Sequence, residues 1–404
     1  MDTKFIMLSL LKKQHWLVYC FIIAVSFAIF TQFPMVDKLL LSNINQAIWF
    51  FIILAIVMNN KNVFLSKYFK YMITSFVFLF VLSNLLLLMQ VKNIFPSLVR
   101  MMIIPILIYF SSCQIAKVSV DKDTLKVILS FFWIMCFVMA FQIAPNLVTN
   151  YNVWADTEVY LYDGATHKNS TAQLLSCGVL VVFVYIKAKN VIELLLKSFI
   201  LIVFFMALIY VQSRSCLIAI AVALILVILV QTNTNKKIFH IFLLIISYVF
   251  VLNSNWLMNL LRHTFFVDKY SDSNGLDYND FSSGRLEHWS DAFQVFKQHP
   301  FFGAEVESCD NFYINTLASS GIVIGFLFII LWIIRIIYNF KLLKIHSKVV
   351  NDNRSMNLLF AITVFYFTVS LFEAFPPYGP GVATMLLWLL CGYVDGEEYL
   401  DQNE

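Results

Sequence analysis

Residues 194–231 read LLLKSFILIVFFMALIYVQSRSCLIAIAVALILVILVQ, which is two apolar runs joined by a polar turn at residues 212–215. Each run is long enough to form a helix that crosses the ~30 Å of hydrocarbon in a bilayer. Neither run alternates apolar and polar residues with a period of two, as the strands of a membrane barrel do. This stretch therefore predicts two transmembrane helices that reverse direction at a short polar turn.

The whole chain shares this character. Of its 404 residues, 60% are hydrophobic and only 13% are charged, whereas soluble domains carry about 25% charged residues. We expect one all-α, polytopic integral membrane domain over residues 1–404, with no cleavable signal peptide, because further apolar runs follow the first one at once. The predicted spans lie at about residues 14–33, 39–58, 69–89, 95–116, 126–144, 170–186, 194–211, 215–231, 238–256, 311–334, 356–375 and 380–394.

The distribution of basic residues predicts the orientation of these twelve spans. Most of the 28 Lys and Arg residues fall in segments that face the cytoplasm if both termini do, as the positive-inside rule requires. The net charge of +4 then reflects topology and does not indicate nucleic-acid binding. In this orientation residues 335–355 form a basic inner loop, residues 395–404 form a frayed acidic tail, and residues 257–310 form a large extracytoplasmic loop.

The seven cysteines are scattered along the chain. No pair has the spacing of metal ligands, and no disulfide framework is visible. We therefore expect no metal held by cysteines, and we expect no other cofactor.

The large outer loop contains one predicted helix, from about residue 282 to residue 299, where Pro300 stops it. Its apolar residues recur at spacings of three, four and three, which is an amphipathic pattern; they are Leu286, Trp289, Phe293 and Phe296. We expect this helix to lie with its apolar side against the membrane face or the helical bundle.

Two arginines on the outer side are candidate anion-binding residues. Arg214 lies where two apolar helices reverse, so its guanidinium is either a snorkelling group at a helix end or a clamp for phosphate oxygens. Arg285 and His288 are one turn apart and share a face of the loop helix. That face is either simply solvated or, with the free backbone amides of the serine-glycine helix start, suited to an anion.

Carboxylates form the second group of candidates. Glu305, Glu307 and Asp310 precede the tenth span, and one of them could act as a base toward a sugar hydroxyl, although ordinary solvation of a loop explains each of them as well. Arg100 and Glu373 lie inside the fourth and eleventh predicted spans. Charges at such depths usually face a cavity or a partner.

Several short motifs follow one another in a characteristic order: residues 164–169 before the sixth span, Gln212-Ser213-Arg214, Ser283-Gly284-Arg285 with Trp289, residues 299–303, and residues 310–313 through Gly321. This ordered set resembles the O-antigen ligase and polymerase superfamily of bacterial surface-polysaccharide enzymes. The resemblance covers about residues 160–330.

The resemblance implies a metal-independent, type C-like glycosyltransferase. Such an enzyme moves a glycan from a polyprenyl diphosphate carrier to an acceptor on the outer face of the inner membrane, and Arg214 and Arg285 would neutralise the diphosphate. Asp310 is the first candidate for the base, followed by Glu307, Glu305 and His288. The candidate substrate-binding residues are His167, Lys168, Asn169, Arg100, Asn311 and Tyr313. The implied partners are the lipid-linked oligosaccharide, membrane lipids and a chain-length regulator, with no nucleic acid.

One departure from the family pattern favours a repeat-unit polymerase over a ligase. Ligases of this family resemble one another in having a histidine just before the Asn at the start of the span after the loop, where this chain has Cys309-Asp310-Asn311. The alternatives are a ligase that transfers glycan to lipid A-core and a lipid-linked oligosaccharide flippase. A flippase would usually show internal repeats, and the sequence shows none.

Overall fold

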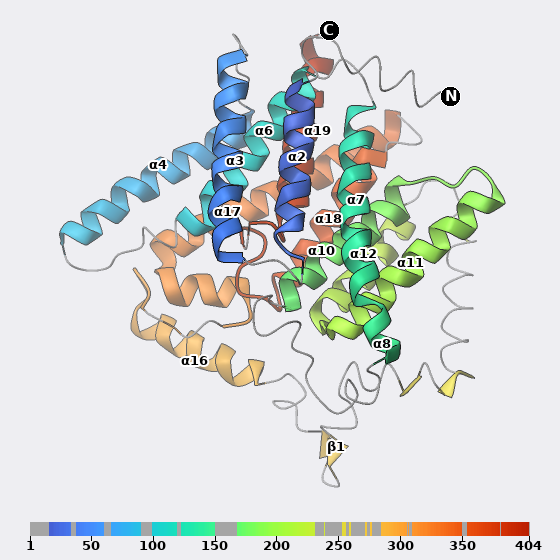
Figure 1. Cartoon of the computed structure of the whole chain (residues 1–404). Helices are drawn as coiled ribbons and strands as arrows, with labels where there is room; N and C mark the ends of the chain where they lie inside the picture. Colours follow the sequence, from blue (N-terminus) through green and yellow to red (C-terminus); the bar gives the residue numbers. More distant parts are fainter. Residues whose placement is uncertain are drawn as a thin grey trace. The chain divides into compact units, whose positions relative to one another are not determined.

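The computed structural model (Figure 1) describes a large part of the chain in a helical arrangement. The residues it describes are 16–33, 38–59, 66–89, 99–118, 123–149, 168–230, 238, 253–255, 258–259, 271–272, 275–276, 284–304, 306, 309–349, 354–379 and 381–403. Contacts group the chain into two compact units. Unit 1 comprises Met1–Met139, Leu161–Val181 and Tyr378–Glu404, and unit 2 comprises Ala140–Tyr160 and Val182–Pro377.

Helices make up most of the described residues. They are α2 (Trp16–Phe30), α3 (Lys38–Asn59), α4 (Lys67–Leu88), η1 (Val99–Ile103), α6 (Ile104–Val118), α7 (Thr124–Ile143), α8 (Pro145–Thr149), α10 (Lys168–Leu180), η2 (Val181–Tyr185), α11 (Val191–Val211), α12 (Arg214–Val230), α16 (Arg285–Gln298), α17 (Phe312–Val349), α18 (Arg354–Val369) and α19 (Met385–Asn403). A two-residue antiparallel pair, β1 (Ser271–Asp272) with β2 (Gly275–Leu276), is the minor exception. The all-α class is thus confirmed for this part of the chain.

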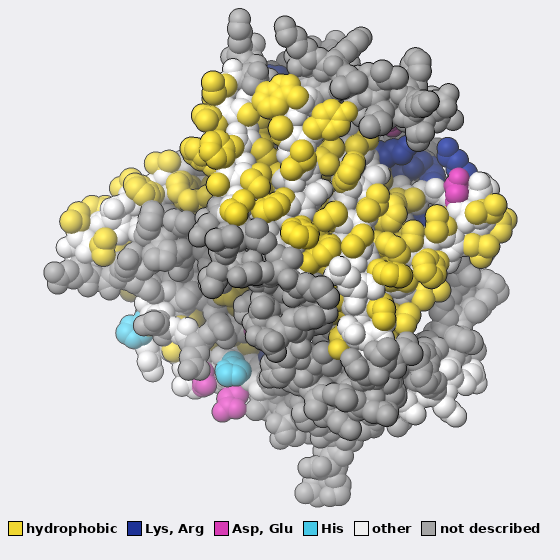
Figure 2. Space-filling view, viewed as in Figure 1, with side chains coloured by type: hydrophobic (Ala, Val, Ile, Leu, Met, Phe, Trp, Pro, Cys, Tyr) yellow, Lys and Arg dark blue, Asp and Glu magenta, His cyan; other side chains and the backbone are white. Residues whose placement is uncertain are grey.

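Every predicted span except the ninth overlaps a helix, and the ninth lies mostly outside the described residues. Four described segments are long and apolar enough to cross a membrane: Lys67–Leu88, Thr124–Leu147, Val191–Val211 and Phe312–Ile345. Large hydrophobic side chains are exposed on several helices, such as Ile192 at 78% and Leu88 at 80%. Figure 2 shows hydrophobic side chains over most of the described surface in its view. Exposed apolar surface on this scale identifies an integral membrane protein; the number of twelve spans stays a prediction.

In unit 1, helix α19 packs closely along α6 (Figure 1). Two glycines of α19 permit this approach, because a Cβ at Gly396 would lie 2.6 Å from the carbonyl oxygen of Cys113 and one at Gly392 would collide with that of Tyr109. The Tyr109 hydroxyl donates a hydrogen bond to Asp395 and lies 2.6 Å from Ser66 Oγ.

The prediction of a frayed tail from residue 395 is therefore wrong. The helix continues to Asn403, and Asp395 is buried because its carboxylate has a partner.

In unit 2, the prediction of an inner loop at residues 335–355 is also wrong over most of that range. Helix α17 continues to Val349. Arg335 is fully buried within it, and Asn339 donates a 2.8 Å hydrogen bond to Thr363 of α18. The basic residues Lys341 and Lys344 are exposed on one face while apolar neighbours continue the helical pattern on the other. A count of positive charges alone could not reveal that the helix continues through this segment.

Helix α17 is interrupted at Gly321, whose φ of +68° and ψ of −179° are not helical. The turn at residues 299–303 docks at this break, where Ile322 N donates to Pro300 O at 2.8 Å and Ala304 N donates to Ala318 O at 3.0 Å. A Cβ at Gly303 would lie 2.6 Å from Ala318 O, and one at Gly321 would overlap the backbone of residue 301. Two glycines with positive φ thus let the turn after α16 rest directly on the backbone of α17.

We predict that Gly321→Ala destabilises the protein, because the backbone conformation costs a side chain about 1–3 kcal/mol and the added methyl also meets backbone. The measurement is the midpoint of thermal unfolding in detergent. Ile322→Ala is the matched control, because Ile322 is adjacent and 46% exposed. Equal midpoints for the two variants would contradict the docking role of Gly321.

Candidate active site

Four side chains of unit 2 form a connected polar group that we call the Arg285 cluster: Ser215, Arg285, Asp310 and Glu373. Arg285 Nε lies 3.3 Å from Asp310 Oδ2, and Arg285 Nη2 lies 3.7 Å from Glu373 Oε1. Ser215 Oγ donates a 2.9 Å hydrogen bond to the same Glu373 oxygen. One guanidinium therefore connects two carboxylates that are 63 positions apart in the sequence.

The cluster forms where four helices begin or end. Ser215 is the second residue of α12, Arg285 is the first residue of α16, Asp310 lies just before α17, and Glu373 lies just after α18. The positive ends of three helix dipoles, those of α12, α16 and α17, therefore meet at one place in unit 2. Together with the guanidinium, they favour the binding of an oxyanion.

Helix α16 is held against the start of α17 by both polar and apolar contacts. The indole nitrogen of Trp289 donates a 3.1 Å hydrogen bond to the backbone oxygen of Asp310. Trp289 and Phe296 pack on a small core of Ala292, Cys309 and Ala318. The amphipathic pattern is confirmed in part: this half of the apolar face covers α17, whereas Leu286 and Phe293 stay exposed at 46% and 47%.

Asn311 and Tyr313 connect α17 to the end of α18. Asn311 Oδ1 accepts the backbone amide of Ile314 at 3.0 Å and so caps α17. Its amide nitrogen donates to Leu371 O at 3.1 Å. The Tyr313 hydroxyl accepts a hydrogen bond from Ser370 Oγ at 3.1 Å. Both polar groups thus have structural partners, and their predicted contact with substrate stays a prediction.

The three ionic side chains differ in exposure, and the difference suits them to different tasks. The Glu373 side chain is only 9% exposed, that of Arg285 is 21% exposed, and that of Asp310 is 44% exposed. An arginine at intermediate depth can bind an oxyanion through its remaining N–H groups, and an exposed carboxylate can accept a proton. The arrangement can therefore bind a phosphorylated group beside a general base.

Cys309 directly precedes Asp310 of the cluster and is buried. Burial raises the pKa of its thiol to about 11, and the neighbouring Asp310 carboxylate contributes to this rise. The thiol is therefore protonated and unreactive at neutral pH.

We predict slow alkylation of Cys309 by iodoacetamide at pH 7.5, with the rate rising about tenfold per pH unit up to about pH 11, because only the thiolate reacts. Mass spectrometry of the peptide that contains Cys309 reports the labelled fraction. Asp310→Asn should speed the reaction modestly, since the carboxylate raises this pKa. Labelling as fast in the folded as in the denatured protein would contradict the buried thiol.

The remaining predicted site residues are distributed as follows. Arg214 begins α12, directly before the Ser215 that contacts Glu373. His288 is exposed on α16.

Lys168 and Asn169 begin α10 in unit 1, and Arg100 lies in η1, where its side chain falls outside the described part. His167, Glu305 and Glu307 also lie outside the described residues.

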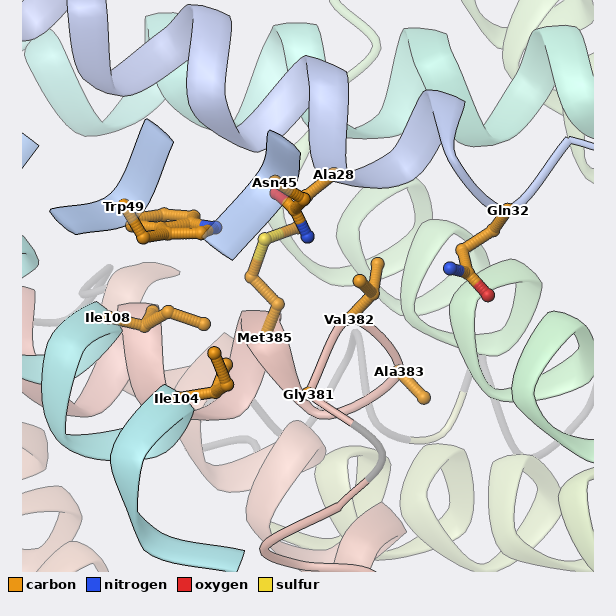
Figure 3. Close-up of a pocket in the computed structure, with 10 residues that line it drawn as sticks. All are labelled: Ala28, Gln32, Asn45, Trp49, Ile104, Ile108, Gly381, Val382, Ala383 and Met385. Carbon is orange, nitrogen blue, oxygen red and sulfur yellow. The ribbon is translucent and has the colours of Figure 1, made fainter. Parts of the chain in front are cut away.

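Unit 1 contains a cavity of about 190 Å³. It is lined from α2, α3, α6 and the segment that leads into α19 (Figure 3). Among its lining residues, Asn45 and Gln32 carry the polar side chains, and the buried Asn45 Oδ1 has no hydrogen-bond partner among the described residues. None of the predicted site residues lines this cavity.

Ser215 is the residue of the cluster that the sequence did not single out, and the sequence assigned Glu373 no role beyond facing a cavity or a partner. A lone carboxylate near the end of an apolar helix predicts a partner, and this expectation is confirmed by Arg285 and Ser215. The identity of the partner could not be predicted, because α12, α16 and α18 are far apart in the sequence. Among the described residues there is no group of three or more His, Cys, Asp or Glu side chains that could hold a metal ion.

The apolar helices define an integral membrane protein, and its polar cluster places a guanidinium beside an exposed carboxylate. Residues 198–304, about a quarter of the chain, match the family model described as O-antigen ligase. This match supports membership of the O-antigen ligase/polymerase superfamily, as the motifs predict, and members of the family are glycosyltransferase-like membrane enzymes. A comparison with curated proteins gave no match. The matched segment includes most of α11 and all of α12 and α16, and so it contributes Ser215 and Arg285 to the cluster.

Proposed function

We propose that this protein is a repeat-unit polymerase of a bacterial surface polysaccharide. It transfers a glycan chain from a polyprenyl diphosphate carrier to the next lipid-linked repeat unit on the outer face of the inner membrane. It does so as a metal-independent glycosyltransferase that spans the membrane twelve times, with both termini in the cytoplasm. In this proposal residues 1–404 form one membrane domain, with an O-antigen ligase/polymerase-like core at residues 160–330 and the outer loop at residues 257–310.

The observation that carries this proposal is the pairing of Arg285 with Asp310 at 3.3 Å. Asp310 occupies the position before Asn311 where the ligases of the family have a histidine. A guanidinium beside an exposed carboxylate provides the two groups that this transfer needs, one for the diphosphate and one for the proton.

In the proposed reaction, the acceptor hydroxyl attacks the anomeric carbon of the donor while Asp310 takes its proton. The bond between that carbon and the diphosphate oxygen breaks, and its electron pair stays on the diphosphate. Arg285 and Arg214 stabilise the charge that collects there. Residues 167–169, Arg100 and the first turn of α17 remain candidates for contacts with the glycan.

A ligase that transfers glycan to lipid A-core is the second candidate, because the matching family model carries that name. The glycan of a deletion strain separates the two functions. A polymerase deletion leaves single repeat units on the surface without a ladder, whereas a ligase deletion removes the units as well.

We predict that Arg285→Ala abolishes elongation while membrane insertion stays normal, because the leaving diphosphate loses its fixed cation. Loss of one such electrostatic donor costs about 10²–10³ in rate. Purified protein with lipid-linked repeat units in detergent gives the measurement, as the length of the product chains. This assay also excludes a flippase, since transport has no meaning in detergent.

Lys297→Ala is the matched control, because it removes a cation from the other end of the same helix, where Lys297 lies over the ring of Phe293 at 4.8 Å. Its chains should match those of the wild type. Full-length ladders from Arg285→Ala would refute the role of Arg285 as the diphosphate clamp.

A further inference from the structure

The guanidinium of Arg285 is already engaged in the structure. Its Nε faces Asp310 and its Nη2 faces Glu373. The remaining N–H groups of the guanidinium can donate paired hydrogen bonds to a diphosphate. The two carboxylates beside the guanidinium nevertheless repel an incoming anion. Donor binding is therefore strongest once one of these carboxylates has moved away.

The structure indicates which carboxylate is held firmly. Glu373 is buried, with a side chain only 9% exposed, and it also accepts the hydrogen bond from Ser215. Releasing a buried carboxylate from its partners costs several kcal/mol. Glu373 is therefore the permanent partner that positions Arg285.

Asp310 has the opposite properties. Its side chain is 44% exposed, so water can solvate the carboxylate once it leaves Arg285, and ion pairs this exposed are worth little. Its backbone is fixed by the hydrogen bond from Trp289 and by the adjacent cap residue Asn311. The carboxylate can therefore leave by rotation about the side-chain bonds alone, and it stays next to the site.

We propose that the donor diphosphate displaces Asp310 from Arg285 while Glu373 keeps the guanidinium in place, and that this exchange releases Asp310 as the base. The inference rests on the proposed function and adds an order of events to it. Before the donor binds, Arg285 holds the carboxylate away from any acceptor hydroxyl. After the exchange, the diphosphate takes the place of the carboxylate on the cation.

The exchange leaves the chemistry of transfer unchanged. The diphosphate replaces the Asp310 carboxylate on Arg285, and water solvates the displaced carboxylate because its side chain is 44% exposed. The free carboxylate then takes the proton of the acceptor hydroxyl as the new glycosidic bond forms. The released polyprenyl diphosphate finally leaves, and Asp310, after giving its proton to water, returns to Arg285.

The test is the equilibrium binding of a sugar-free polyprenyl diphosphate to the purified full-length protein in detergent, for the wild type, Asp310→Asn and Asp291→Asn. Asp310→Asn removes the competing charge at constant size, so the diphosphate should bind about twofold to fivefold more tightly, the scale of a half-exposed ion pair. The same variant should lose elongation. Asp291→Asn is the matched control, since Asp291 is an exposed acid on the same helix, and it should change neither measurement.

Unchanged or weaker diphosphate binding by Asp310→Asn would overturn the exchange, whatever happens to elongation. If Asp310→Asn is poorly folded, Asp310→Ala replaces it, and the same tightening is expected because the competing charge is again absent. A wild-type protein that binds the diphosphate but elongates nothing would instead refute the polymerase. The two failures are therefore distinguishable, because one is read from binding and the other from product length.

Discussion

The buried carboxylate of Glu373 is the constraint on which the arrangement of unit 2 depends. An ionised carboxylate at the end of an apolar helix is costly unless it is paired and hydrogen-bonded. Here the partners come from the first turns of two other helices, Ser215 of α12 and Arg285 of α16. This need for partners draws together two turns that the sequence separates by about 70 residues, and it turns three helix termini into one site.

The glycines at positions 303 and 321 have a supporting role in the same arrangement. They let the turn after α16 lie on the backbone of α17, where no side chain would fit. This contact and the Trp289 hydrogen bond fix both ends of α16 relative to α17. Since Arg285 is the first residue of α16, these contacts fix the position of its backbone relative to that of Asp310.

The sequence predicted the elements better than it predicted their ends and partners. Apolar runs of membrane-spanning length were sufficient to locate the helices among the described residues, and α16 ends before Pro300 as expected, although it begins at Arg285 and not at about residue 282. The predictions of a loop for the basic segment from Arg335 and of a frayed tail for the acidic segment from Asp395 are wrong. Each segment has a buried charge within a continuing helix, and burial depends on partners such as Tyr109 that lie far away in the sequence.

The partners within the site could not be predicted from the sequence either. Arg285 and Asp310 were recognisable because each stands beside a helix start in a motif. Their pairing with each other and with Glu373 depends on tertiary packing, which no local pattern encodes.

The residue before Asn311 bears on how such a site can be controlled. A histidine at this position is neutral or positive, so it would form no ion pair with a neighbouring guanidinium, and it would be available as a base whether or not a donor is present. An aspartate is negative, so in the proposed exchange the arginine that holds the diphosphate also restrains the base. Under that proposal one cation serves both groups in turn, and proton transfer is coupled to donor binding. This coupling suits a polymerase in particular, because both of its substrates carry a diphosphate and only the donor must meet the arginine for chemistry to begin.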